Sequence, residues 1–217
     1  MSRPNGLLAA GADLSSARLL DAYGRGIFPW FNDGEPPLWW SPDPRMVLFL
    51  GELHVSRSLR RRVRSGVYTV TVDAAFEAVM AGCADRRRDG DGTWITTEMF
   101  VAYGHLHRLG HAHSVEVWAG DDLVGGLYGV AIGRMFFGES MFARKTDASK
   151  VALAHLARQI ERWGFEVIDC QMATSHLSSL GAREIPRAEF VGHVRRLAAL
   201  PAVPSPWRLA AGIAESF

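Results

Sequence analysis

Two short segments carry side chains that could do chemistry, and the first is Ile168-Asp169-Cys170-Gln171. In a strand, alternate side chains share a face, so Asp169 and Gln171 project together while Ile168 and Cys170 point the other way. A carboxylate beside an amide can orient that amide, which then offers a donor and an acceptor to a substrate. A hydrogen-bonded pair at a sheet edge would give the same pattern, so both interpretations stay open.

The second segment is Gly138-Glu139-Ser140, which follows the apolar run Met135-Phe136-Phe137. Burying a lone glutamate and serine in such a strand is costly unless both find hydrogen-bond partners. Either Glu139 recognises a cation from the wall of a pocket, or it is an exposed residue in a turn at the strand's end.

A basic run extends from His54 to Arg64, although the formal net charge of the 217-residue chain is only +1. On a helix, residues three and four apart share a face, so most of these arginines would lie together while Leu59 and Val63 face inward. The run is either a phosphate-binding surface or a solvated helix face. Its arginines are Arg57, Arg60, Arg61, Arg62 and Arg64.

Several other kinds of site are not expected. Of the histidines at 105, 107, 111 and 113, only the middle two have i, i+4 spacing, and no H-E-x-x-H accompanies them, so we expect no metal. The two cysteines are far apart, which argues against a disulfide framework or a four-ligand zinc site. No glycine-rich phosphate loop and no G-x-S-x-G is present, so neither a cradled nucleotide nor serine catalysis is expected.

The elements that must position these residues mix helices and strands. We expect helices over 13–26, 56–64, 73–84, 97–109 and 147–163 and from about 186, and strands over 46–50, 67–72, 113–120, 123–142 and 165–172. The prolines between residues 29 and 44 argue against regular structure there. This order predicts an α+β fold with a mixed sheet, divided into a small N-terminal domain over 1–45 and a larger domain over 46–217.

Composition fits a globular protein, with 48% hydrophobic and 22% charged residues. The near-neutral charge argues against a surface that binds nucleic acid everywhere, so a polyanion must meet a local patch. The first ten residues lack the basic and apolar regions of a signal peptide, and no stretch reaches the roughly 20 apolar residues that span a bilayer. We therefore expect a cytoplasmic protein.

Nine segments occur in the order found in the leucyl/phenylalanyl-tRNA–protein transferases, which the sequence resembles over nearly its whole length. Three of these motifs are highly specific in combination, namely WWSPDPR (39–45), GESMF (138–142) and IDCQ (168–171). The matching segments also include PNGLLA (4–9), DLSSARLLDAYGRGIFPWF (13–31), TWIT (93–96), AYGHLHRLGHAHSVEVW (102–118), LVGGLYGVAIGRMFFGESMF (123–142), which ends in the GESMF motif, ASK (148–150) and LGAREIPR (180–187). The resemblance implies a small N-terminal domain and a larger domain related to the GNAT acetyltransferase fold.

The resemblance also implies a reaction. Leu or Phe, and less readily Met, would pass from aminoacyl-tRNA to proteins that begin with Lys or Arg, producing a bacterial N-degron. The implied partners are the aminoacyl-tRNA and these acceptor proteins, with no cofactor, metal or membrane.

Carried over position by position, the resemblance places catalysis on Asp169 and Gln171 and contact with tRNA on the arginines of 57–64. The implied pocket for the aminoacyl group and adenosine is mostly apolar. It consists of Trp30, Trp94, Leu127, Phe136, Gly138, Glu139, Ser140, Leu153, Leu156, Ile160 and Ile168.

The residue types then suggest roles. The amide of Gln171 does not titrate in the usual range, so we expect it to position the attacking amine or support the oxyanion rather than act as a base. Asp169 should fix the orientation of that amide and attract the basic acceptor residue. Glu139 should contact the acceptor's Lys or Arg side chain.

Two other functions compete with this interpretation. An acetyl-CoA-dependent GNAT acetyltransferase would need an [RQ]-x-x-G-x-[GA] turn to hold pyrophosphate at a helix N-terminus, but MFARKT (141–146) precedes the expected helix without a glycine. A non-catalytic RNA-binding module could use the arginines and exposed tryptophans, yet it would leave the Asp169–Gln171 pair and the apolar pocket without a role.

Overall fold

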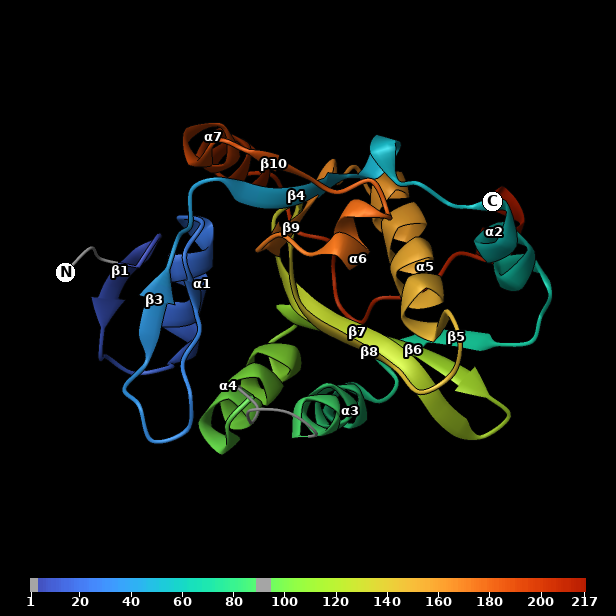
Figure 1. Cartoon of the computed structure of the whole chain (residues 1–217), viewed down its shortest axis with the longest axis horizontal. Helices are drawn as coiled ribbons and strands as arrows, with labels where there is room; N and C mark the ends of the chain where they lie inside the picture. The colour runs from blue at the N-terminus through green and yellow to red at the C-terminus, as the bar shows by residue number, and fades with distance from the viewer. Residues whose placement is uncertain (1–3, 89–94) are drawn as a thin grey trace.

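The computed structural model describes residues 4–88 and 95–217. It has the predicted α+β architecture, with a small N-terminal sheet beside a larger mixed one (Figure 1). The small sheet has the order β1-β3-β2 and is antiparallel. Its strands are β1 (Leu7–Ala10), β2 (Phe28–Pro29) and β3 (Leu38–Trp40), and α1 (Ser16–Gly24) lies between the first two in sequence.

Regular structure among the prolines of 29–44 was not predicted, and that expectation is wrong for β2 and β3. Phe28 pairs with Trp40, and Pro29 pairs with Trp39. A proline can occupy β2 because β2 is an edge strand, where a missing N–H donor leaves no neighbour unsatisfied.

The larger sheet has seven strands in the order β10-β4-β9-β8-β7-β6-β5. All neighbours are antiparallel except β8 and β9, which are parallel. The strands are β4 (Arg45–Phe49), β5 (Thr69–Val72), β6 (Ala112–Ala119), β7 (Asp122–Ile132), β8 (Met135–Ala143), β9 (Val167–Gln171) and β10 (Arg183–Ile185).

The single strand predicted over 123–142 is wrong, because the chain reverses at Gly133 to give the hairpin of β7 and β8. Gly133 has a φ of 58°, and a Cβ built on it would lie 2.5 Å from the carbonyl oxygen of Leu197. Only glycine fits this left-handed, crowded turn. Strand β10 was also not predicted.

The helices and short 3-10 turns complete the chain. They are α2 (Arg57–Arg64), α3 (Phe76–Arg88), α4 (Thr97–Arg108), α5 (Ala148–Arg162), α6 (Ser175–Ser178), α7 (Arg187–Ala198), η1 (Leu50–Glu52) and η2 (Ile213–Ser216). Ser56 caps α2 by accepting a hydrogen bond from the Leu59 amide at 3.2 Å. Asp147, the residue directly before α5, makes no side-chain cap bond and has a left-handed φ of 62°.

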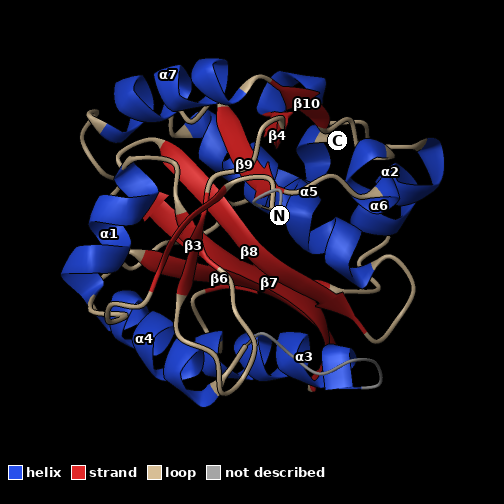
Figure 2. Ribbon diagram, turned by 60° about the vertical axis from the view of Figure 1, so that its left-hand side comes forward, coloured by secondary structure: helices blue, strands red, loops and turns tan. Residues whose placement is uncertain are grey.

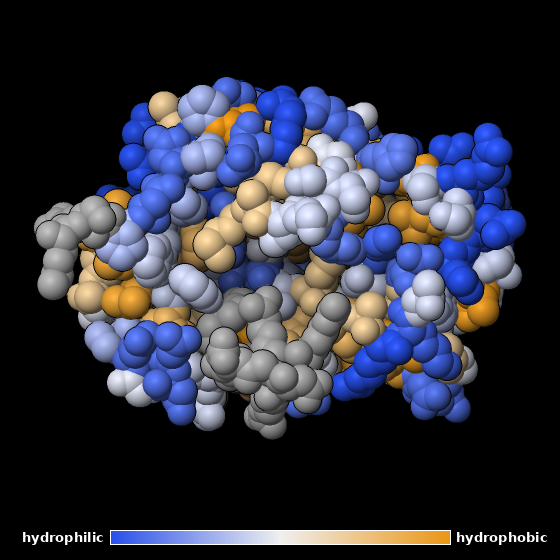
Figure 3. Space-filling view, viewed as in Figure 1, coloured by the Kyte–Doolittle hydropathy of each residue, from blue (hydrophilic) through white to orange (hydrophobic). Residues whose placement is uncertain are grey.

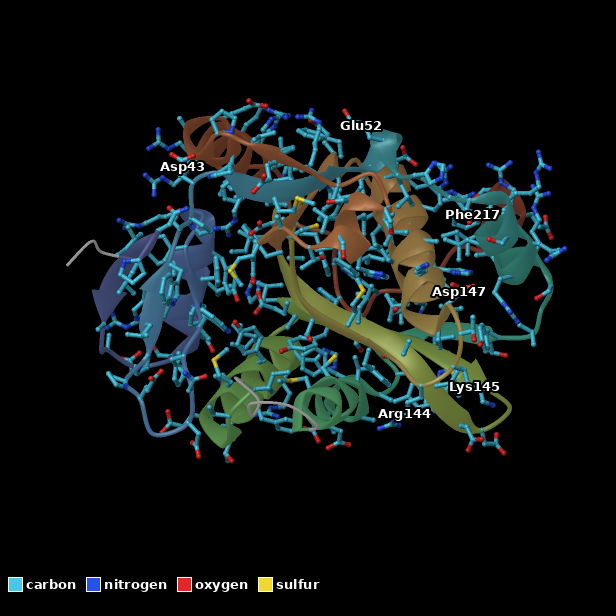
Figure 4. All side chains as sticks on the ribbon, viewed as in Figure 1. Asp43, Glu52, Arg144, Lys145, Asp147 and Phe217 are labelled. Atoms are coloured by element: carbon cyan, nitrogen blue, oxygen red, sulfur yellow. The ribbon has the colours of Figure 1, made fainter. Side chains whose placement is uncertain are left out.

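Helices cover both faces of the larger sheet (Figure 2). On one face α1, α3, α4 and α7 enclose a core that also contains Tyr23, Phe28 and Trp39, so the N-terminal segment packs directly on the sheet. On the other face α5 packs against β6, β7 and β8, with α2 beyond it. The chain ends there at Phe217, which is buried against His155 (Figure 4).

The N-terminal segment is fastened to α7 by polar contacts around Asp43 (Figure 4). Asp43 Oδ1 accepts a hydrogen bond from the Arg187 amide at 3.0 Å, and Arg187 Nη1 donates to the carbonyl of Ser41 at 2.7 Å. Among the helices that the structure describes, none is long and apolar enough to cross a membrane.

Candidate active site

A cavity of about 270 Å³ lies where the parallel strands β8 and β9 end their pairing. The paired positions are Phe136 with Ile168 and Phe137 with Asp169. Both strands line the cavity, β8 with Phe136 and residues 138–141 and β9 with residues 168–171. Figure 3 shows the surface hollowed near the centre of the face that carries α6.

Both strands carry an extra residue at this point. Gly129 pairs with Gly138 and Tyr128 with Ser140, so Glu139 is the unpaired residue of a β-bulge. On β9, Asp169 pairs with Val47 and Gln171 with Met46, so Cys170 between them is unpaired. Bulges redirect side chains and are common beside active sites. Strict alternation along the strands therefore fails at the site itself.

Gln171 follows the second bulge in a left-handed conformation, with a φ of 62°. The backbone N–H of Gln171 donates a hydrogen bond to Asp169 Oδ1 at 2.9 Å. Such a bond between residues two apart is typical of a turn. A non-glycine residue with this φ is strained, and such strain persists where the surroundings enforce it. Asp169 and Gln171 thus line the same cavity, as alternation predicted, although by a different local geometry.

Arg45 holds Asp169 from behind. The guanidinium donates from Nε to Oδ1 at 2.7 Å and from Nη2 to Oδ2 at 2.6 Å, and both side chains are completely buried. The rings of Phe28 and Phe190 lie 4.7 and 4.5 Å from the guanidinium carbon. This fork of charge-assisted bonds fixes the carboxylate, and the aromatic faces fix the arginine.

The role expected for Asp169 needs a correction. Its oxygens accept from Arg45 and from the Gln171 backbone, while the Gln171 side chain donates from Nε2 to Glu139 Oε1 at 2.9 Å. Glu139 therefore orients the amide, and Asp169 fixes the backbone that carries it. With no exposed surface and a cation already paired, Asp169 is also unsuited to attracting a basic acceptor residue.

Glu139 is a buried carboxylate with three donors. Besides Gln171, Tyr23 Oη donates to its Oε1 at 2.7 Å and Tyr103 Oη to its Oε2 at 3.1 Å. Burial raises the pKa of Glu139 to about 7, against the hydrogen bonds from the two tyrosines, which lower it. The alternative of an exposed glutamate in a terminal turn is wrong, because Glu139 is only 7% exposed.

The rest of the cavity is mostly apolar, and most of the predicted pocket residues lie in its wall. The predicted residues that line it are Trp30, Leu127, Phe136, Gly138, Glu139, Ser140, Leu153, Leu156 and Ile168. Ile160, near the end of α5, is buried in the core and does not line the cavity. Trp94 lies outside the described residues.

The rim combines an aromatic and a flexible apolar side chain. Trp30 is 37% exposed, and its carbonyl accepts from Trp40 Nε1 at 2.7 Å while the two rings pack edge to face. Met172, directly after β9, is 46% exposed. Both could cover a flat ring that enters the cavity.

Sequence reasoning missed several residues of the site. Tyr23, Arg45 and Tyr103 act through hydrogen bonds that join distant parts of the chain. Thr174, His176 and Leu177 at α6 also line the cavity, and their only sequence signal was a position directly after a strand that ends at the site. Further lining residues that were not predicted are Phe28, Pro29, Tyr128, Met141, Cys170 and Met172.

The predicted basic surface forms on α2 and lies apart from the cavity. Leu59 and Val63 are buried, as predicted, and the arginines of α2 make no ion pair with any described residue. Arg57, Arg60, Arg61 and Arg64 are exposed and Arg62 is half-buried over the ring of Tyr68. In Figure 1, α2 and the N-terminal sheet lie at opposite ends of the molecule.

Two of the histidines at 105, 107, 111 and 113 stack on aromatic rings. His113 contacts Asp73 at 2.8 Å and stacks on Trp207, and His107 stacks on Phe76. Over residues 4–88 and 95–217, no group of three or more His, Cys, Asp or Glu residues could hold a metal ion.

Comparison with known sequences decides the family. The model of the leucyl/phenylalanyl-tRNA protein transferase family matches residues 47–195, and that of its N-terminal domain matches residues 12–43. The chain belongs to this family. The transferase is thus an enzyme.

Relatives of the transferase are similar over most of their length. One from Nitrosospira multiformis is 64% identical over 195 residues, covering 90% of this chain and 84% of the relative. One from Thiobacillus denitrificans is 61% identical over 204 residues, covering 94% of this chain and 90% of the relative. Both are named leucyl/phenylalanyl-tRNA–protein transferase.

Solved structures resemble the transferase more distantly. L-PGS from Bacillus licheniformis is 11% identical, with a TM-score of 0.49 over 79% of this chain and 66% of that one. A GCN5-related N-acetyltransferase from Kribbella flavida is 14% identical, with a TM-score of 0.40 over 73% of this chain and 56% of that one. Neither score reaches 0.5, so these two likenesses carry no conclusion about the fold or the reaction.

Proposed function

We propose that this enzyme transfers Leu or Phe, and less readily Met, from aminoacyl-tRNA to the α-amine of proteins that begin with Lys or Arg, which creates an N-degron. One observation carries the proposal: a single cavity joins an apolar wall to a buried carboxylate that holds the Gln171 amide. The apolar wall suits the side chain of the transferred amino acid, and the polar side suits the reacting amine.

The reaction needs no ATP, because the ester that links the amino acid to the tRNA ribose is already activated. The acceptor's α-amine has an ordinary pKa of about 7.7–8.0, so a useful fraction is neutral at cellular pH. The amine nitrogen bonds to the ester carbonyl carbon, the bond from that carbon to the ribose oxygen breaks, and the ribose oxygen takes up a proton. A strong base is not required.

Gln171 is the residue we assign to this step. One N–H of its amide donates to Glu139 at 2.9 Å, which leaves the second N–H and the carbonyl oxygen for substrate. The oxygen can accept from the attacking amine, or the N–H can support the oxyanion. Such preorganised dipoles typically contribute several kcal/mol, because they need no reorganisation during the reaction. Asp169 and Arg45 keep the Gln171 backbone in its left-handed conformation.

Selection of Leu and Phe follows from the apolar wall. Leu127, Leu153 and Leu156 present branched, buried surface with no polar partner for a substrate hydroxyl or charge. A difference of one methylene is worth only about 1–3 kcal/mol in such a pocket, so discrimination is incomplete and some Met is accepted.

Recognition of the acceptor falls to Glu139. It is the carboxylate in the cavity that has no cationic partner among the described residues, whereas Asp169 is neutralised by Arg45. A Lys or Arg side chain would supply the missing positive charge, and an uncharged N-terminal residue would not.

The tRNA would approach with its 3′ adenosine against Trp30 and its acceptor stem toward the arginines of α2. Adenine stacking on an exposed tryptophan is a common mode of single-strand recognition, and phosphate contacts by arginine make binding salt-dependent. Because charged tRNA is found in the cytoplasm, we place the enzyme there.

Transfer of radiolabelled Leu from Leu-tRNA to two peptides, identical except for an N-terminal Arg or Ala, tests the proposal. Label should enter the Arg peptide alone. Equal labelling of both peptides would remove the assigned acceptor specificity, and labelling of neither would remove the transfer itself. Replacing Leu-tRNA with acetyl-CoA in the same assay distinguishes the acetyltransferase alternative.

A further inference from the structure

Two buried tyrosines from different helices share the carboxylate of Glu139. Tyr23 on α1 donates to Oε1 and Tyr103 on α4 donates to Oε2, at 2.7 and 3.1 Å. The two hydroxyls also contact each other, so the three groups form a closed ring. Both tyrosines are completely buried. Tyr23 belongs to the N-terminal segment, so this ring joins the small part of the chain to the large one.

The ring can be analysed by counting protons. Burial, followed by the charge of Glu139, raises the pKa of both tyrosines well above the ordinary value, so both hydroxyls remain donors. When Glu139 is ionised, the two hydroxyl protons point at its oxygens. When Glu139 is protonated, a third proton is available and all three contacts of the ring can be filled. In the ionised state both hydroxyl protons are used on the carboxylate, so the contact between the two hydroxyls holds no proton.

The remaining surroundings of Glu139 leave one position open. Oε1 accepts from Tyr23 and Gln171, whereas Oε2 accepts only from Tyr103 among the described residues. A carboxylate oxygen can accept about two hydrogen bonds, so Oε2 retains one free position. The charged groups facing Glu139 are Asp169, which disfavours its ionisation, and Arg45, which favours it but is committed to Asp169.

We propose that Tyr23 and Tyr103 are positioning residues for acceptor recognition: they fix both oxygens of Glu139 and leave a single acceptor position, on Oε2, for one cationic N–H group of the acceptor. This inference rests on the proposed function. It adds that the acceptor's charge is met by one oxygen rather than by a two-pronged fork, so Lys and Arg are received alike. Acceptor binding is then coupled to ionisation of Glu139.

Removing either hydroxyl weakens the ionised form most, because bonds to a charged acceptor are about twice as strong as neutral ones. The pKa of Glu139 should therefore rise further in Tyr23→Phe and Tyr103→Phe. A rise of about one unit from about 7 would reduce the ionised fraction about fivefold at pH 7 but only about 1.3-fold at pH 8.5.

The experiment compares Tyr23→Phe and Tyr103→Phe with Tyr68→Phe, a matched control. Tyr68 also donates one hydroxyl bond, to the carbonyl of Thr146 at 2.9 Å, but lies outside the cavity. KM for an Arg-initiated peptide, KM for Leu-tRNA and kcat are measured at pH 7.0 and 8.5. We expect the peptide KM to rise about fivefold at pH 7.0 in both ring variants and to approach the control at pH 8.5. The KM for Leu-tRNA and kcat should match the control throughout.

Other outcomes would overturn the inference. If both ring variants raise the two KM values equally, or if the rise is independent of pH, the tyrosines only support packing. If the ring variants match Tyr68→Phe while the wild type transfers Leu normally, this inference fails and the proposed function stands. If the wild type transfers no Leu to the Arg peptide, the proposed function itself fails.

A measurement on the wild type covers the case in which the ring variants do not fold. Calorimetric titration of the Arg peptide at pH 7 in two buffers of different ionisation enthalpy reports proton release. Since Glu139 has a pKa of about 7 and is ionised in the complex, about half a proton should be released per peptide bound. An Ala-initiated peptide carries the same α-amine, so the Arg peptide should release about half a proton more than the Ala peptide, and equal release by the two peptides would contradict the coupling.

Discussion

Replacing Arg45 with methionine removes the cation that neutralises Asp169 while keeping a side chain of similar length. Both partners are completely buried, and their two bonds are 2.7 and 2.6 Å long. Leaving one member of a buried pair uncompensated typically costs about 3–5 kcal/mol. For a chain of this size, each kcal/mol shifts the melting temperature by about 2–4 °C, so Arg45→Met should melt about 6–20 °C lower.

The chain offers a control in Arg196, which donates two bonds to Glu166, from Nη1 and Nη2, at 2.7 and 2.6 Å but is half exposed. Exposed pairs contribute at most about 1 kcal/mol, because water screens both charges. Arg196→Met should therefore lower stability by less than about 1 kcal/mol. The two pairs have bonds of the same lengths, so the comparison tests mainly the effect of burial.

A double variant tests whether the cost arises from the unpaired charge. In Arg45→Met with Asp169→Asn, the buried position no longer carries a charge, and the Asn oxygen can still accept from the Gln171 amide. The double variant should be more stable than Arg45→Met alone. Urea unfolding followed by tryptophan fluorescence gives the four free energies of this cycle. The reasoning would be refuted if Arg45→Met cost no more than Arg196→Met, or if the two single losses simply added.

Three further predictions concern the site and the basic helix. Folding raises the pKa of Glu139 from 4.5 to about 7, so the folded protein holds this proton more tightly than the unfolded chain does. The stability that Glu139 contributes to the folded state is therefore full below pH 4.5 and is lost as pH rises through 7. The loss in the free energy of unfolding amounts to about 3 kcal/mol. Glu139→Gln should remove that pH dependence in urea unfolding, and in kinetics it should raise the KM of an Arg peptide more than that of Leu-tRNA. Gln171→Glu should lose most transfer activity at every pH, and full activity with a new pH profile would rule out positioning by an amide. The double variant Arg60→Ala, Arg61→Ala should weaken Leu-tRNA binding. The slope of log affinity against log salt should fall by about one for each phosphate group that the variant no longer binds. The melting temperature should not fall, because both side chains are exposed.

Local patterns were sufficient to predict much of the fold. The spacing of residue types over a few positions predicts the apolar face of α2 and the buried strands β6 and β9. It also predicts that α5 ends before the glycine that follows it. The hairpin turn at Gly133 was missed because Gly133 is one of five glycines within residues 123–142, and nothing in the local sequence distinguishes the one at which the chain reverses. Strands β1, β2, β3 and β10 were missed because each has only two to four residues and depends on partners distant in sequence.

The site was predictable in its residue types but not in its connections. Asp169, Gln171 and Glu139 stood out because polar groups in apolar strands need partners. Those partners lie far away in the chain, since Arg45 is 124 residues from Asp169 and Tyr23 is 116 residues from Glu139. The bulge at Glu139 could not be anticipated either, because it arises from the register between β7 and β8 and not from the sequence of β8 alone.

The claim on which the account depends is that the Gln171 side chain takes part in the transfer step. A single-turnover measurement of Leu transfer from Leu-tRNA to an Arg-initiated peptide, made with Gln171→Ala and paired with a tRNA-binding titration, tests it directly. Loss of a preorganised donor typically costs about 10²–10³ in rate, so the transfer rate constant should fall by that factor while the Kd for tRNA stays within about twofold. An unchanged rate constant, or a parallel loss of tRNA binding, would contradict the account.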